Sequence, residues 1–124
     1  MPYVDIYILT IINKFLFLKQ LLFQDISKWD TSKVTTTHRM FETASLFNSD
    51  LSKWDMSNVR YMNLMFTKAY MFNQDISKWV TAKVTSFEAM FQEAQAFNAD
   101  ISKWVGIGFL LIIIVLTVFF IIFH

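Results

Sequence analysis

Cysteine is absent from the sequence, glycine occurs only twice and proline once, and charged residues account for only 17% of the chain. Without cysteine the chain cannot form a disulfide framework, a thiolate zinc site or a cysteine nucleophile. The scarcity of glycine and proline excludes a linker rich in these residues, a collagen helix and a disordered tail. The 11 basic and 10 acidic residues nearly cancel, so the net charge does not favour nucleic acid or an acidic substrate as a partner.

Hydrophobic residues make up 55% of the 124 positions, and they concentrate at the C-terminal end. The segment from Val105 to Phe123 contains no charged residue, and Thr117 carries its only polar side chain. As a helix it would be roughly 28 Å long, close to the roughly 30 Å hydrocarbon core of a bilayer. We therefore predict a transmembrane helix at 105–123, with the lipid bilayer as a partner, rather than a buried core helix or an apolar strand.

Residues 1–21 form a second, less regular apolar segment. Residues 6–12 are mainly apolar, but Asp5, Lys14 and Lys19 lie around this run. A lysine at the centre of a span costs about 2.5–3.5 kcal/mol on insertion scales. The segment is therefore open to four interpretations: an interfacial helix, a cap over the next element, a signal-like segment or a second span.

Between these two ends the sequence repeats itself at a constant step of 25. All four copies contain D-(I/L)-S-K-W, which places aspartates at Asp25, Asp50, Asp75 and Asp100 and tryptophans at Trp29, Trp54, Trp79 and Trp104. Three apolar columns recur in the full copies: Val34, Val59 and Val84; Phe41, Phe66 and Phe91; Ala44, Ala69 and Ala94. The repeat region, 22–104, contains three full copies (22–46, 47–71 and 72–96) and a partial fourth that ends at Trp104. Such a period indicates a solenoid or a repeat array.

Each copy predicts a strand followed by a helix. The D-(I/L)-S-K-W segment is short and ends in an aromatic residue, which is typical of a strand. In the second copy, apolar residues at 59, 62, 65, 66, 69 and 72 would lie on one face of a helix. The predicted fold class is therefore a short α/β solenoid of strand–turn–helix coils, followed by the transmembrane helix. The recurring Trp, Val, Phe and Ala residues would stack as a core ladder, and the aspartates as a turn ladder.

The repeat also resembles that of a known family. Its pattern, F-N-x-D-(I/L)-S-K-W-(D/V) with V, M-F and A at fixed later positions, is similar to that of BspA-type leucine-rich-repeat surface proteins, a repeat also found in mycoplasmal surface lipoproteins and in algal proteins. The resemblance covers about 22–104, two-thirds of the chain. It implies a leucine-rich-repeat-like fold, a place at the cell surface, and a role in adhesion or protein binding rather than catalysis. The chain departs from the pattern at Phe23, where Asn is usual, and at Val80 and Val105, which replace Asp.

Residues that could carry chemistry do not converge in the repeat. The aspartates could bind calcium between stacked coils, but turn formation is the plainer interpretation. His38 and His124 are far apart in the sequence and neither has a second histidine beside it, so a metal or acid–base site is not expected. The tryptophans could stack on sugars or bases, although a core ladder explains them better. The region 22–104 has equal numbers of basic and acidic side chains, so nucleic acid is not an expected partner. We expect neither enzymatic activity nor a cofactor.

The expected function is that of a membrane-anchored, non-catalytic repeat module for protein interaction or surface adhesion. Its partner would be another protein or a second copy of the chain, bound at exposed positions between the repeated columns: Lys33, Thr36, Arg60, Tyr61, Lys83 and Ser86. The alternative is a truncated or degenerate fragment of a larger repeat surface protein without independent activity, and an enzyme is a distant third. Lys103, before the predicted span, favours a cytoplasmic module, whereas the family resemblance favours the cell surface.

Overall fold

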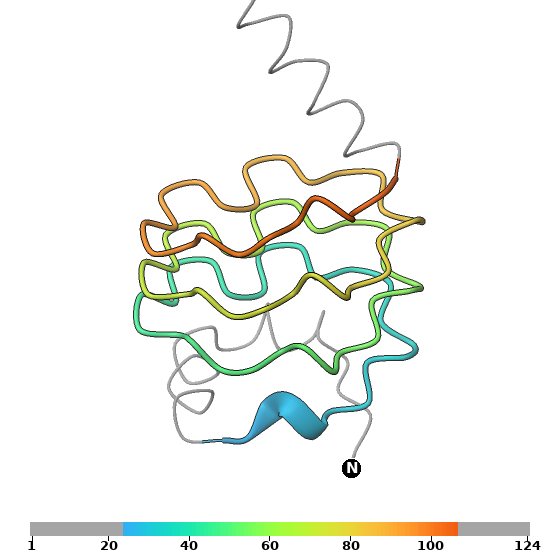
Figure 1. The fold of residues 1–124 in the computed structure, drawn as a ribbon, viewed down its shortest axis with the longest axis horizontal. Helices are drawn as coiled ribbons and strands as arrows, with labels where there is room; N and C mark the ends of the chain where they lie inside the picture. Colours follow the sequence, from blue (N-terminus) through green and yellow to red (C-terminus); the bar gives the residue numbers. More distant parts are fainter. Residues whose placement is uncertain (1–23, 107–124) are drawn as a thin grey trace, which may run out of the picture.

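The computed structural model describes residues 24–106, which wind into a stack of flattened coils (Figure 1). Each coil has two long sides. We call one side the Trp row (residues 25–29, 50–54, 75–79 and 100–104) and the other the Phe row (residues 36–43, 61–68 and 86–93). The first Trp row contains a short 3-10 helix, η1 (Ile26–Lys28). The Phe rows are linked by two isolated parallel bridges, Thr36 to Tyr61 and Tyr61 to Ser86.

The predicted α/β class is wrong for this part of the chain: residues 24–106 contain no α-helix and no named β-strand. In place of a helix, the second Phe row consists of consecutive turns. Met65 N donates to Met62 O at 3.2 Å, and Ala69 N donates to Phe66 O at 3.0 Å. Such closely spaced turns return apolar side chains to one side of the row, which is also what a helix does. The apolar spacing from 59 to 72 therefore fits both structures.

Left-handed backbone conformations are what prevent these turns from continuing as a helix. They occur at equivalent positions in each Phe row, and none of the residues is glycine: Arg39, Leu64 and Ala89, then Thr43, Lys68 and Glu93, with φ between 51° and 63°. A residue with a side chain costs about 1–2 kcal/mol in this conformation. The next coil supplies a partner for the amide at these positions, since Leu64 N donates to Glu88 O at 2.9 Å and Lys68 N to Gln92 O at 2.9 Å.

Backbone hydrogen bonds join each Phe row to the next. They pair residues that are 24 positions apart, one fewer than the 25-residue repeat. Phe41 N donates to Met65 O at 2.9 Å, and one coil further on Phe66 N donates to Met90 O at 2.9 Å. The Trp rows are joined differently, through the indole N–H. Trp54 Nε1 donates to Ile26 O at 2.9 Å and Trp79 Nε1 to Leu51 O at 2.9 Å. Each coil is thus held by its neighbours rather than by a core of its own.

Aromatic rings stack along the inside of the coils and form much of the core. The rings of Phe41 and Phe66 are stacked with centroids 5.4 Å apart, and those of Phe66 and Phe91 are stacked at 5.7 Å. Within one coil, Phe66 and Phe72 stack at 3.9 Å. Phe66 and Phe72 are fully buried. Burial of large aromatic surface is the main favourable contribution to the folding of so short a stack.

The prediction of a single-pass membrane protein is contradicted. Among residues 24–106, no helix is long and apolar enough to cross a membrane. Val105, the first residue of the predicted span, is instead held in the coil, because its N–H donates to Thr81 Oγ1 at 3.0 Å and its carbonyl accepts from the same hydroxyl at 2.8 Å. The residues of that span after Gly106 lie outside the described part, as does the predicted N-terminal segment 1–21.

Candidate functional site

The residues predicted as a core ladder lie inside the coils. The indoles of Trp54, Trp79 and Trp104 are only 3–4% exposed, so they offer no platform on which a sugar or base could stack. Trp29 and Phe91 are partly buried against the same core. The remaining ladder residues are buried: Val34, Val59, Val84, Phe41, Phe66, Ala44, Ala69 and Ala94. None of these side chains is a candidate for ligand binding.

The repeated aspartates form turns in the Trp row. In each copy the carboxylate accepts a hydrogen bond from the N–H two positions later, with an N to Oδ1 distance of 3.1 Å at Asp25, 2.8 Å at Asp50, and 2.9 Å at both Asp75 and Asp100. The Ser77 hydroxyl and then its amide, both donating to Asp75, hold the pKa of that carboxyl below its ordinary value. The Ser52 amide and hydroxyl lower the pKa of Asp50, the positive charge of Lys53 adds to this, and the neighbouring Asp25 carboxylate has a smaller opposing effect. These carboxylates are therefore ionised and fixed in orientation at neutral pH.

Metal binding has no support in the described part of the chain. Residues 24–106 contain no group of three or more His, Cys, Asp or Glu side chains that could hold a metal ion. The aspartates instead use a carboxylate oxygen to close their turns, as Asp100 does with Ser102. His38 Nδ1 lies 3.1 Å from Asn63 O, in a contact between two coils. In the described coils, these side chains take part in turns and in contacts between coils.

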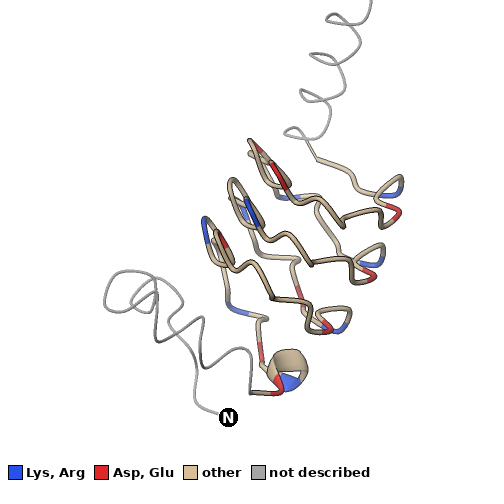
Figure 2. Cartoon of the chain, turned by 90° about the vertical axis from the view of Figure 1, so that its left-hand side faces the viewer, with Lys and Arg blue, Asp and Glu red and all other residues tan. Residues whose placement is uncertain are grey.

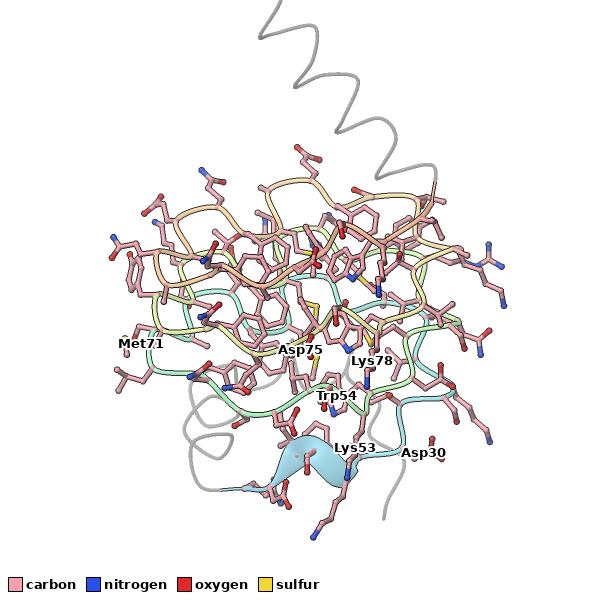
Figure 3. The ribbon with its side chains drawn as sticks, in the orientation of Figure 1. Asp30, Lys53, Trp54, Met71, Asp75 and Lys78 are labelled. Carbon is pink, nitrogen blue, oxygen red and sulfur yellow. The ribbon has the colours of Figure 1, made fainter. Side chains whose placement is uncertain are left out.

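Lysines lie beside the turn aspartates and form a second column of charge that runs along the stack. Lys28 Nζ lies 3.5 Å from Asp25 Oδ2, in the coil that contains η1. The later lysines Lys53, Lys78 and Lys103 are exposed and form no hydrogen bond or close ion pair with residues 24–106. Figure 2 shows acidic and basic residues aligned along one edge of the stack, and Figure 3 shows Lys53 and Lys78 on successive coils. We call this surface the Asp–Lys face: Asp25, Asp50, Asp75, Asp100, Lys28, Lys53, Lys78 and Lys103.

The residues predicted to face a partner come together where each coil turns from the Trp row to the Phe row. We call this the corner surface, formed by Lys33, Thr36, Arg60, Tyr61, Lys83 and Ser86. All six are exposed or half-buried, and Tyr61 is 50% exposed. Lys83 Nζ donates to Asn58 Oδ1 at 2.7 Å, and Asn58 Nδ2 donates to Ser32 O at 2.8 Å, so polar contacts order this surface across three coils. Lysine recurs at 33 and 83, whereas Thr36, Tyr61 and Ser86 differ from coil to coil and give the surface its pattern.

Two sets of side chains join neighbouring coils, a role that the sequence did not predict for them. Asn48 Oδ1 accepts from Asn73 N at 2.9 Å, and Asn73 Oδ1 accepts from Asn98 N at 2.8 Å, so the asparagines tie the coils together. Thr31 and Thr81 each bind both backbone groups of a residue in the next coil; Thr31 Oγ1 donates to Asp55 O at 3.1 Å and accepts from Asp55 N at 2.8 Å. The regular spacing of the asparagines was visible in the sequence, but Met56 interrupts the threonine column and hid it.

Comparison with known proteins places the chain in a family. Residues 10–107 match the family described as Mycoplasma protein of unknown function, DUF285. This match covers well over half of the chain, so the chain belongs to that family. No curated protein and no solved structure matches it.

Proposed function

We propose that this chain is a non-catalytic repeat module that binds another protein through the corner surface. The observation that carries the proposal is the contrast between a regular scaffold and an irregular surface. Stacked rings and backbone hydrogen bonds hold successive coils in register. On the corner, by contrast, the middle coil carries Arg60 and Tyr61 where the neighbouring coils carry smaller hydroxyl residues. Solenoids typically bind through such extended surfaces, on which each repeat contributes different contacts.

The chemistry of the corner surface fits a protein partner. Arg60 and Tyr61 are neighbours on one coil and are both exposed. Arginine and tyrosine are enriched at protein interfaces because each combines a large contact area with a polar group. The Ser57 hydroxyl and amide lower the pKa of Asp55, the neighbouring Asp30 carboxylate opposes them, and the positive charge of Lys83 has a smaller lowering effect. A partner with aromatic and acidic groups would complement this surface.

The repeat pattern supports adhesion as the setting for this binding. Membership of a mycoplasmal family is consistent with the mycoplasmal branch of the repeat resemblance described above. BspA-type surface proteins act in adhesion and protein binding, and we propose the same role at the cell surface for this chain.

Site-specific photocrosslinking tests the corner surface. A photoreactive phenylalanine analogue would replace Tyr61 in the full chain, expressed in the cells that produce it. Lys68, an exposed residue of the Phe row, is the matched control position. We expect a covalent adduct with one defined protein from position 61 that is absent from position 68, and whose yield falls when Arg60→Glu is added. Equal adducts from both positions, or no adduct from position 61, would contradict the proposed function.

A further inference from the structure

The lysines of the Asp–Lys face are retained in every copy, and beyond Lys28 they act on the aspartates of their own coils only at a distance. In D-(I/L)-S-K-W, the tryptophan fills the core, the apolar residue packs against it, and the aspartate and serine close the turn. Lys53, Lys78 and Lys103 make no hydrogen bond or close ion pair within residues 24–106. Other exposed or half-buried columns differ between copies, for example Thr36, Tyr61 and Ser86 in one of them. An invariant exposed column without a close structural contact indicates a surface that binds something.

The aspartates and the lysines of the Asp–Lys face form two columns of charge that run along the stack. The aspartates are fixed by their hydrogen bonds to serine, and the turns repeat on every coil (Figure 2). Stacked indole rings give the step between successive coils, with centroids 5.9 Å apart for Trp79 and Trp104. The face therefore presents a negative column beside a positive column, with like charges close together along each column. Within one stack, the lysine of the same coil lowers the pKa of Asp50 and Asp100 by more than the neighbouring aspartate raises it. Each charged column remains exposed, so opposite charges on a partner would add to this attraction.

A second copy of the same face carries charges in the required arrangement. Suppose that two copies of the face meet about a two-fold axis that runs parallel to the stack. This rotation exchanges the sides on which the two charged columns lie, and it leaves each coil at the same height along the stack. The aspartate column of one copy then lies opposite the lysine column of the other. If the axis is instead perpendicular to the stack and lies in the plane of contact, aspartates meet aspartates and lysines meet lysines. Electrostatics therefore selects the parallel arrangement.

We propose that the Asp–Lys face joins two copies of the chain into a parallel, two-fold symmetric dimer. Asp75 of one copy lies opposite Lys78 of the other, and the same pairing repeats on neighbouring coils. Exposed ion pairs are individually weak, so the dimer depends on their number and is sensitive to salt. The dimer uses a different surface from the corner surface, so a test of the dimer does not test the proposed binding function.

Sedimentation equilibrium of the full chain tests the electrostatic contact. We expect dimers at low salt that dissociate as NaCl rises from about 0.1 M to about 1 M, where the screening length falls from about 10 Å to about 3 Å. Lys78→Glu removes no hydrogen bond of the described coils and should raise the dimer dissociation constant about tenfold. Lys68→Glu, with the same change of net charge on the Phe row, should leave the constant within twofold. A monomer at low salt, or equal effects of the two variants, would overturn the dimer.

Engineered cysteines test its symmetry, because the chain contains no cysteine of its own. Ser77 lies between the two charged columns, close to the proposed axis, so Ser77→Cys should form a disulfide-linked dimer on mild oxidation. Lys68→Cys, the control, should not form one. A mixture of Ser52→Cys and Ser77→Cys chains should give only like-with-like dimers, since a parallel axis pairs each coil with its own equivalent. Disulfides that join position 52 to position 77 as the main product would show an antiparallel contact and refute this arrangement.

Discussion

Replacing Trp79 by phenylalanine removes one link between two coils and keeps an aromatic ring in the core. The indole is 4% exposed, and its Nε1 donates to Leu51 O at 2.9 Å. That carbonyl also accepts from Trp54 N at 3.1 Å, so the substitution removes a hydrogen bond without leaving the acceptor unpaired. We expect about 1 kcal/mol from the lost hydrogen bond and about 1–2 kcal/mol from the smaller ring, a total of about 2–3 kcal/mol.

Urea unfolding of the full chain, followed by far-UV circular dichroism, measures this loss without relying on tryptophan fluorescence. Tyr61→Phe is the control, because Tyr61 is 50% exposed and loss of its hydroxyl should change the free energy of unfolding by less than about 0.5 kcal/mol. Trp79→Leu should be more destabilising than Trp79→Phe, since it also removes the ring from the stack. If Trp79→Phe were as stable as Tyr61→Phe, the indole would not join the coils and the reasoning would be refuted.

Three further substitutions or conditions test other contacts. Thr81→Val removes the hydroxyl that binds both backbone groups of Val105 and should lower the free energy of unfolding by about 1–2 kcal/mol, whereas Thr35→Val, at an exposed residue, should change it little in the same assay. Gly106→Ala would place a methyl group 2.8 Å from Thr81 O at a φ of 142°; such strain costs about 1–3 kcal/mol, so amide exchange at Val84 should accelerate by about 5- to 150-fold. Because hydrogen bonds from serine lower the pKa of the turn aspartates below their ordinary 3.8, their contribution to stability is present above about pH 4 and lost as pH falls further; a urea midpoint that stays constant down to about pH 2 would contradict this.

The repeat period and the turns could be predicted from the sequence because both depend on the identity and spacing of particular side chains. A ladder of tryptophans needs an indole on every coil, and the constant step from Trp54 to Trp79 and on to Trp104 shows it directly. An aspartate two positions before a serine can reach its amide whichever fold surrounds it, and the structure places this contact at Asp75. These features depend on local chemistry and on spacing, which a single sequence contains.

The absence of α-helices from residues 24–106 could not be predicted, because the features that exclude them lie in the backbone. Leu64 and Thr43 adopt left-handed conformations, yet neither is a glycine or an asparagine, the residues that usually mark such positions. The bonds that stabilise them join amides and carbonyls of neighbouring coils, and almost any residue can supply these groups. A spacing of three or four between apolar residues therefore favoured a helix only because the turns have nearly the same period.

The predicted span and the candidate surfaces show a second limit of prediction from a single sequence. Hydropathy at 105–123 favoured a transmembrane helix, but it did not show that Val105 continues the column of Asp30 and Asp55 and is bound by Thr81. Tyr61 and its equivalents Thr36 and Ser86 could be predicted as exposed because they differ between copies. The distance between each repeated lysine and its aspartate could not be predicted, and among the described coils the structure shows a close pair only at Lys28.

Scalar coupling across hydrogen bonds, measured by NMR on the isotopically labelled full chain, tests the coil stack most directly. The amide of Phe66 lies 2.9 Å from the carbonyl oxygen of Met90, whereas in an α-helix it would donate to the carbonyl of Met62. The stack predicts a coupling from the Phe66 nitrogen to the Met90 carbonyl carbon. A coupling from the same nitrogen to the Met62 carbonyl carbon would show a helix and contradict the stack of coils.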